Sequence, residues 1–257
     1  MTKPYVTLSC AMSIDGYLDS ADPHKLPMSN SADFDRVDQL RADSDAILVG
    51  ASTVRRDDPR LLVRSAERRR LRRAAGLAES PAKVTVTASG DISPDAAFFR
   101  EGDAEKIVYC ARAVEDALAA KLGDTATVVG LDGGEISMGD VVRDLERRGI
   151  KRLMVEGGGH VHTQFLTEQL ADELQLVVAP FFVGESRAPR FVESGHFPWT
   201  VKHRATLAET RQIGDVVLLR YALSDRFDPS ACPAAAEGNG AHTSAIEGRD
   251  LRPAHLP

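Results

Sequence analysis

The chain has 257 residues, 43% of them hydrophobic, and its 32 basic and 38 acidic residues give a formal net charge of −6. This length allows a sizeable core, and the acidic balance argues against a general nucleic-acid binder, because nucleic-acid-binding domains are usually basic. Neither a membrane-spanning apolar run nor a secretory signal is recognised, and Cys10, Cys110 and Cys232 lie too far apart for a zinc site or a disulfide framework, so a cytoplasmic protein is expected.

The start of the chain predicts a strand followed by a helix. Residues Tyr5–Ser13 alternate in character and are rich in β-forming residues, so they are predicted to form a strand. A serine or asparagine at positions 29–31 can cap a helix, and Arg41 lies near the end of that helix. Three residues at helical spacing form its expected apolar face, namely Phe34, Val37 and Leu40.

A ligand crevice is expected where the next strand ends. The run Asp45–Gly50 is short and apolar, and it leads into a polar turn or short helix at Ala51–Pro59. Small and hydroxyl residues at the carboxyl end of a strand suit a ligand site, which in open α/β sheets usually lies there. Simple capping of a helix by Ser52 or Thr53 is the alternative interpretation.

Six arginines between positions 64 and 73 form the densest positive charge in the chain. A nucleic-acid patch is one interpretation, but no aromatic residues are interleaved with these arginines to stack bases. We therefore interpret the run as a solvated loop or helix. Arg64 is a separate question because it adjoins the polar turn.

Predicted strands and helices alternate through the middle of the chain. Further strands are predicted at Val84–Thr87, Lys106–Cys110 and Thr125–Gly130. A helix at Ala113–Leu122 separates the last two strands, and Ser137 can cap another helix before the strand that ends at Glu156. Such alternation indicates a mainly parallel sheet covered by helices.

The segment Leu153–Leu166 has the pattern of a strand, a glycine turn and the first turns of a helix. Free N–H groups at a helix N-terminus bind anions, and glycines let a phosphate approach them. A nucleotide phosphate is therefore the first candidate ligand, and a merely permissive turn is the alternative. Glu156 is unfavourable beside a phosphate, which suggests a second duty such as holding a polar substrate.

The C-terminal part of the chain predicts a mixed sheet and a tail. Residues Asp172–Pro180 are strand-like, and Val201–Glu209 and Val216–Ala222 are predicted to pair as an antiparallel hairpin at one sheet edge. From Ser224 onward, small polar residues, prolines and glycines replace the periodic pattern. The sequence therefore predicts one domain over 1–223 and a disordered tail over 224–257.

Several separated blocks occur in a recognisable order and spacing. They are Ala11–Gly16, Leu40–Ala42, Asp45–Val54, Asp57–Arg64, Val155–Gly159, Asp172–Leu174 and Ala179–Gly184. Together they resemble the RibD C-terminal reductase family of riboflavin biosynthesis, roughly from Tyr5 to Tyr221. The resemblance implies a dihydrofolate-reductase-like α/β fold, with a mixed, mostly parallel sheet flanked by helices and a C-terminal antiparallel hairpin.

The same resemblance implies an activity, a cofactor and an assembly. The expected enzyme is an NADPH-dependent oxidoreductase, similar to 5-amino-6-(5-phosphoribosylamino)uracil reductases. It would pass hydride to ribose C1′ of a ribosylaminopyrimidine 5′-phosphate and so form the ribitylamino compound. Aligning two bound molecules would then be the main task of the protein. A homodimer without nucleic-acid or membrane partners is also expected.

Site residues follow from the resemblance position by position. The expected cofactor contacts are Ala11, Met12, Thr53, Asp57 and Ser89, with a phosphate cradle of Gly157, Gly158, Gly159, His160, Val161, His162, Thr163 and Gln164. The expected substrate contacts are Arg41, Leu61, Arg64 and Glu156. The arginines suit the sugar phosphate, because a guanidinium bonds phosphate oxygens in pairs, and Glu156 suits the pyrimidine amino and ring N–H groups.

The acid or base of the reaction is expected to be Asp57 or Glu156, with Asp57 slightly favoured and water as the alternative. No metal is expected at His160 and His162, because alternate helical positions face different directions.

Two departures from the family leave alternatives open. A zinc deaminase motif is not recognised, so a stand-alone reductase is expected and the deamination state of its substrate is open. The usual tryptophan near Pro27 is also missing, since the only tryptophan is Trp199. Alternatives are a reductase of the same fold acting on dihydrofolate, a pterin or a secondary-metabolite pyrimidine, or a non-catalytic nucleotide-binding protein.

Overall fold

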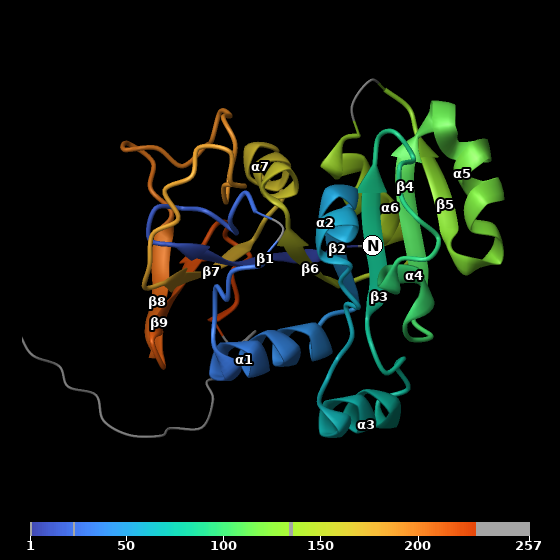
Figure 1. Cartoon of the computed structure of the whole chain (residues 1–257). Coiled ribbons are helices and arrows are strands. Elements are labelled where there is room, and N and C mark those ends of the chain that lie inside the picture. Colours follow the sequence, from blue (N-terminus) through green and yellow to red (C-terminus); the bar gives the residue numbers. More distant parts are fainter. Residues whose placement is uncertain (1, 23, 134–135, 230–257) are drawn as a thin grey trace, which may run out of the picture.

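One nine-stranded sheet runs through the described residues, 2–22, 24–133 and 136–229, of the computed structural model (Figure 1). Its strands are β1 (Tyr5–Ser13), β2 (Ala46–Gly50), β3 (Ala82–Thr87), β4 (Lys106–Ala111), β5 (Thr127–Leu131), β6 (Arg152–Gly157), β7 (Glu173–Ala179), β8 (Thr206–Ile213) and β9 (Val216–Ala222). The spatial order is β5-β4-β3-β2-β6-β1-β7-β9-β8. Strands β1 to β7 pair in parallel, and β9 is antiparallel to β7 and β8, which confirms the predicted mixed sheet and terminal hairpin. The predicted bounds Val201–Glu209 of the first hairpin strand were wrong, since β8 begins at Thr206 and ends at Ile213.

Helices cover both faces of this sheet. They are α1 (Ser31–Ala42), α2 (Ala51–Asp57), α3 (Ala66–Ala74), α4 (Ala97–Arg100), α5 (Glu115–Leu122), α6 (Met138–Arg147) and α7 (Gly159–Thr167). Side chains alternate across a strand, so Leu48 of β2 packs with α6 and α7, whereas Ile47 and Val49 pack with α1, α2, α4 and α5. Helix α3 contacts α1 and lies apart from the sheet (Figure 1).

Helix α1 buries two of the three residues of its predicted apolar face, since Leu40 lies in the core and Val37 packs against it. Its N-cap is Asn30, within the predicted positions, but Phe34 is 44% exposed and Asp33 and Asp38 are buried together with Leu40. The prediction was therefore wrong for Phe34 alone. The physical reason is that Asp38 turns inward to accept backbone hydrogen bonds from the segment before α3.

The ends of the sheet strands explain where a ligand can bind. Strands β2 and β6 run in parallel, and each is followed directly by a helix, α2 and α7 respectively. Their carboxyl ends therefore lie at one edge, beside the end of β1 and of β3. This is the edge at which open α/β sheets hold ligands.

The beginning of the predicted tail contacts the body of the domain. The Ser224 hydroxyl donates to Asp172 Oδ1 at 2.6 Å, and the Arg226 guanidinium donates to the backbone oxygen of Lys3 at 2.8 Å. Residues 224–229 thus bind back to the N-terminal strand, and 230–257 lie outside the described residues. Over the described ranges, no helix combines the length and the apolar character that crossing a membrane requires.

Candidate active site

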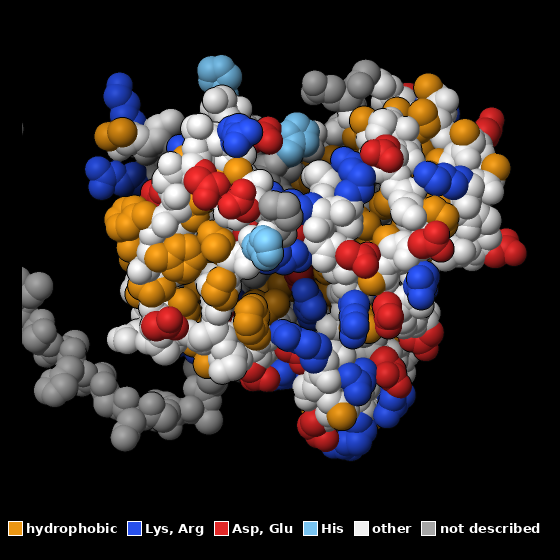
Figure 2. Space-filling view, viewed as in Figure 1, with side chains coloured by type: hydrophobic (Ala, Val, Ile, Leu, Met, Phe, Trp, Pro, Cys, Tyr) orange, Lys and Arg blue, Asp and Glu red, His pale blue; other side chains and the backbone are white. Residues whose placement is uncertain are grey.

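Three adjoining cavities form one cleft at the carboxyl edge of the strands. We name them the Ser89 cavity, the middle cavity and the Arg64 cavity, with volumes of about 410, 350 and 440 Å³. Gly158 and His160 line both of the first two, and Asp57 and Glu156 line both of the last two. Figure 2 shows the hollow at the centre of the molecule, with Lys and Arg side chains gathered along it.

The Ser89 cavity lies between two helix starts, and several polar side chains line it among apolar ones. Ser52 comes from α2, Ser89 follows β3, and Gln164 comes from α7. Arg55 also lines this cavity, where its guanidinium donates to the backbone oxygen of Asp91 at 2.6 Å and lies 3.6 Å from the Asp91 carboxylate. Hydroxyl groups, a guanidinium and the N–H groups at the start of α7 suit a phosphorylated ligand.

The glycines of the turn have different reasons to be glycine. Gly157 has φ of +110° and lies against the His162 ring, so a side chain there is both strained and crowded. A Cβ on Gly159 would lie 2.2 Å from the backbone oxygen of Arg190, which leaves it no room. Gly158 lines two cavities, and a Cβ there would meet only Thr53 Oγ1, at 3.2 Å. Gly158 and Gly159 both line the middle cavity, and Gly158 alone of the three also lines the Ser89 cavity.

Helix α7 brings some predicted cradle residues to the cleft and buries others. Val161 and Gln164 line the Ser89 cavity, and His160 lines the cleft with its Nδ1 2.9 Å from Glu193 Oε2. His162 is fully buried, and desolvation lowers its pKa to about 4. Thr163 donates to the Gly159 backbone oxygen and accepts from the Glu193 N–H. The side chains of His162 and Thr163 therefore support the turn from behind.

Two other expected contacts also lie away from the cleft. Leu61 is 1% exposed and packs in the core beneath α1 and α2, and Met12 packs against the core on the α6 and α7 side of the sheet. Ala11, in contrast, lines the middle and Arg64 cavities, and Thr53 lines the middle cavity. Among the described residues, no group of three or more His, Cys, Asp or Glu side chains is placed to hold a metal ion.

The two expected catalytic carboxylates share the centre of the cleft. Asp57 lies at the end of α2, and its Oδ1 is 3.3 Å from Lys25 Nζ. Glu156 lies in β6, and both of its oxygens accept from Arg41, each at 2.7 Å. Each carboxylate thus has one cationic partner, and both border the middle and Arg64 cavities.

Arg41 is engaged by Glu156 and does not face the cleft as a free cation. The last turn of α1 meets the end of β6, so the planar guanidinium fits the carboxylate oxygens in pairs. Arg41 Nη1 donates to the Leu62 backbone oxygen at 3.2 Å, and this bond holds the guanidinium on the side away from Glu156. Arg64 is different, because 57% of its side chain is exposed and it lines the Arg64 cavity.

Several residues of the cleft were not singled out from the sequence. Cys10 lines the middle and Arg64 cavities, and desolvation raises the pKa of its thiol, so it is a neutral thiol and not a thiolate nucleophile. Arg190 lines the middle cavity and donates to Tyr17 Oη at 2.8 Å. Cys10 had been considered only as a metal or disulfide candidate, and the segment around Arg190 has no periodic pattern that points to a site.

Comparisons with known proteins agree on the type of protein. The sequence matches the model of the RibD C-terminal domain over residues 4–219. It is 33% identical over 226 residues to a 2,5-diamino-6-ribosylamino-4(3H)-pyrimidinone 5′-phosphate reductase of Archaeoglobus fulgidus, covering 88% of this chain and 99% of that one.

Two solved structures share the fold. One is a pyrimidine reductase-like protein of Corynebacterium diphtheriae, with a TM-score of 0.71 and 22% identity over 85% of this chain and 91% of its own. The other is a deaminase/reductase of Thermotoga maritima, with a TM-score of 0.68 and 22% identity. The match covers 86% of this chain and 56% of the Thermotoga chain.

Proposed function

Because the chain belongs to the RibD C-terminal domain family, we propose that it reduces 2,5-diamino-6-ribosylamino-4(3H)-pyrimidinone 5′-phosphate with NADPH in riboflavin biosynthesis. The product is the corresponding ribitylamino compound. The observation that carries this proposal is the continuous cleft, which has an anion-binding turn at one end, an exposed arginine at the other and two carboxylates between them. A cleft of this form can align a dinucleotide with a phosphorylated sugar.

The Ser89 and middle cavities fit a dinucleotide cofactor. Gly158 presents backbone without a side chain toward Thr53, and the start of α7 presents N–H groups beside it. Arg55 is 43% exposed and its pair with Asp91 is a weak surface contact, so the 2′-phosphate that NADPH has and NADH lacks can compete for the guanidinium. This supports NADPH over NADH. When bound, the nicotinamide supplies the hydride.

The Arg64 cavity fits the substrate. Arg64 binds the sugar phosphate, and Glu156, oriented by Arg41, accepts hydrogen bonds from the pyrimidine amino and ring N–H groups. Asp57, with Lys25 beside it, is placed to donate or accept the proton that sugar-ring opening requires. The Archaeoglobus relative is named for the substrate that still carries its second amino group, which supports the undeaminated pyrimidine.

The test is NADPH oxidation with three substrates supplied separately. These are the diamino pyrimidinone phosphate, its deaminated uracil analogue and dihydrofolate. We expect the diamino compound to be turned over with the highest kcat/KM. Faster turnover of the uracil analogue would overturn the choice of substrate, and turnover of dihydrofolate alone would overturn the pathway.

We also propose that the protein is a cytoplasmic homodimer. Among the described residues both Cys10 and Cys110 are free thiols, which suits a reducing compartment. Apolar side chains are exposed at the edge of the sheet formed by β8 and β9, where Figure 2 shows a hydrophobic area. Leu207 of β8 is 52% exposed and Val217 of β9 is 37% exposed, and Phe182, in the segment that follows β7, is 70% exposed. Exposed apolar side chains gathered at a sheet edge are typical of a protein interface.

A further inference from the structure

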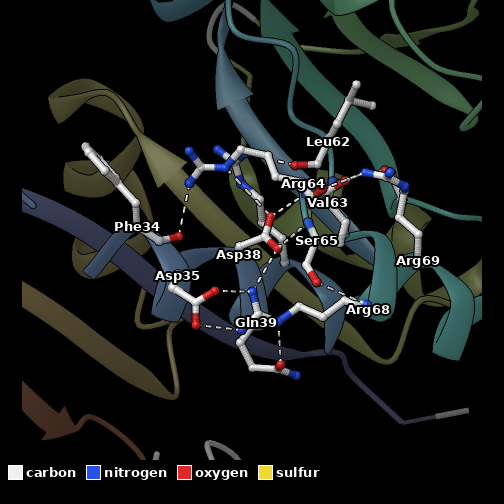
Figure 3. A network of polar contacts seen from close by, with 12 residues as sticks. Phe34, Asp35, Asp38, Gln39, Leu62, Val63, Arg64, Ser65, Arg68 and Arg69 are labelled. Atoms are coloured by element: carbon white, nitrogen blue, oxygen red, sulfur yellow. Dashed lines mark hydrogen bonds and ion pairs between the residues drawn. The ribbon is translucent and has the colours of Figure 1, made fainter. Parts of the chain in front are cut away.

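We infer that the arginine-rich helix α3 is a positioning device, in which Arg68 acts through Asp38 to hold Arg64 ready for the substrate phosphate. This inference rests on the proposed function, since it assigns a role to residues around the same cavity. It also replaces the interpretation of the arginine run as merely solvated. Figure 3 shows the network of contacts that supports it.

Asp38 of α1 fixes the backbone at Arg64. Its carboxylate is 2% exposed, and its Oδ1 accepts from the Arg64 N–H at 2.5 Å while its Oδ2 accepts from the Ser65 N–H at 3.0 Å. Although burial alone raises the pKa of Asp38, these hydrogen bonds hold it below its ordinary value. Asp38 therefore stays ionised and binds two consecutive N–H groups, which determines where the chain enters α3.

Arg68 of α3 supplies the nearer of two positive charges beside the buried Asp38, the other being Arg64, whose Nε lies 3.8 Å from Asp38 Oδ1. Arg68 Nη1 donates to Asp38 Oδ2 at 2.9 Å, and its Nε donates to Gln39 Oε1 at 2.7 Å. Two further bonds of 2.7 Å join its guanidinium to both oxygens of Asp35. A buried carboxylate without a partner is unfavourable, so Arg68 maintains the geometry of Asp38. The acceptors lie three and four positions apart and therefore share one side of α1.

The other side of the Arg64 backbone is held as well. Arg69 Nη1 donates to the backbone oxygens of Val63 and Arg64, at 2.9 and 2.7 Å. The Arg64 guanidinium lies 5.5 Å from the centre of the Phe34 ring and donates to the Phe34 backbone oxygen at 3.0 Å. Main chain and side chain are thus both oriented before substrate arrives, so less conformational freedom is lost on binding.

Arg70 of the same helix provides a matched control. It donates to Glu67 alone among the described residues, and both side chains are 62% exposed. Replacing Arg70 with methionine removes one positive charge from the same helix without touching Asp38 or Arg64. Any effect of Arg68→Met that Arg70→Met lacks is therefore due to the network and not to net charge.

The test compares Arg68→Met, Arg68→Lys and Arg70→Met in steady-state kinetics with the full chain. Because Arg68 acts on phosphate binding, we expect Arg68→Met to raise KM for the phosphorylated substrate about tenfold, with kcat and KM for NADPH changed less than about twofold. Arg68→Lys should raise this KM less than Arg68→Met does, since lysine can pair with Asp38 but lacks the several N–H donors of a planar guanidinium. Arg70→Met should resemble the wild type.

A substrate without its phosphate provides the second comparison. Wild type and Arg68→Met should have equal KM for the dephosphorylated substrate, because this substrate has no phosphate for Arg64 to bind. Arg64→Met and the double variant with Arg68→Met should have the same KM for the phosphorylated substrate, since one change already removes the effect of the other. Equal losses with both substrates, or no difference between Arg68→Met and Arg70→Met, would overturn the inference.

Binding of ribose 5-phosphate, measured by calorimetry, separates this inference from the proposed reaction. If the wild type reduces no ribosylaminopyrimidine, the proposed function fails. The positioning role is still supported if Arg68→Met weakens ribose 5-phosphate binding and Arg70→Met does not. Equal affinity in all three proteins would overturn it. If Arg68→Met fails to fold, Asp38→Asn is used in its place. Its affinity for ribose 5-phosphate is then compared with the affinities of the wild type and Arg70→Met.

Discussion

Glu156 is held by Arg41 in a geometry that leaves one side of the carboxylate open to the cleft. Both oxygens accept from the guanidinium at 2.7 Å, and the two side chains are 15% and 16% exposed. The family resemblance implied that Arg41 contacts the substrate phosphate, whereas its pairing with Glu156 supports the proposed role of orienting that carboxylate. The pair also resolves how a carboxylate can lie beside an anion-binding turn, because its charge is already compensated.

Arg41→Gln should therefore lower turnover because Glu156 binds the pyrimidine less well, and not because binding of the substrate phosphate is weakened. Removing one partner of a largely buried pair leaves an uncompensated charge, which costs about 3 kcal/mol in stability. We expect kcat/KM to fall about 100-fold with the phosphorylated substrate and equally with its dephosphorylated form. A loss confined to the phosphorylated substrate would return Arg41 to the phosphate site.

The role proposed for Arg55 is to select NADPH over NADH. Arg55→Met should raise KM for NADPH by about 10- to 100-fold, because a charge-assisted hydrogen bond is worth about 1.5–3 kcal/mol, and leave KM for NADH unchanged. Arg147→Met is the control, since Arg147 lies on α6, is 71% exposed and pairs with Asp144. Equal losses with the two cofactors would exclude a role in selecting the extra phosphate.

At the scale of elements, strand and cap patterns predicted the scaffold well. The strand Tyr5–Ser13 and the cap Ser137 are found where they were predicted, because alternation and capping are local properties of the chain. The four-residue helix Ala97–Arg100 was missed, since it is too short to show a period. The inward turn of Asp38 was also missed, because its partner Arg64 comes from a distant segment.

The candidate site was predicted less completely than the fold. Motif position gave the strand ends and the glycine turn, and these do line the cleft. It could not say that His162 points inward or that Arg41 is taken up by Glu156, because these depend on packing between elements. Residues such as Arg190 reach the cleft from an irregular segment and left no local signal.

Helix α7 contains a pH-sensitive element in His162. Neither ring nitrogen has a hydrogen-bond partner among the described residues, and desolvation lowers the pKa from 6.5 to about 4. The unfolded chain thus binds more protons than the folded one between these values. The free energy of unfolding therefore has its full value above pH 6.5. It decreases by about 3 kcal/mol as the pH falls from 6.5 toward 4, because the unfolded chain then takes up a proton at His162.

His162→Leu removes this titration while keeping a buried side chain of similar size. Urea unfolding of wild type and variant at pH 7 and pH 4.5 measures the difference. We expect the free energy of unfolding of the wild type, relative to the variant, to fall by about 2–3 kcal/mol between the two pH values. A constant difference would mean that His162 is already hydrated or protonated in the folded state.

At the scale of the whole molecule, the cleft and the edge proposed for dimerisation lie on different parts of the sheet. The cleft lies at the carboxyl ends of the parallel strands, whereas β8 is a terminal strand of the sheet in the described residues. Its hairpin extends the sheet beyond β7 without lining any of the three cavities. Surface at this end can therefore be devoted to contact between copies without obstructing ligand entry.

Sedimentation velocity can test whether this edge forms the proposed dimer. An unpaired terminal strand beside exposed apolar side chains invites association, and a charge placed there opposes it. Leu207→Lys combined with Val217→Lys, two like charges on β8 and β9, should convert a dimer into a monomer that keeps its fold. Leu77→Asp, at a residue 46% exposed after α3, is the control and should remain dimeric. A wild type that sediments as a monomer would contradict the proposed dimer. A double variant that stays dimeric would contradict an interface on β8 and β9, since burying charges without partners there would disfavour the dimer.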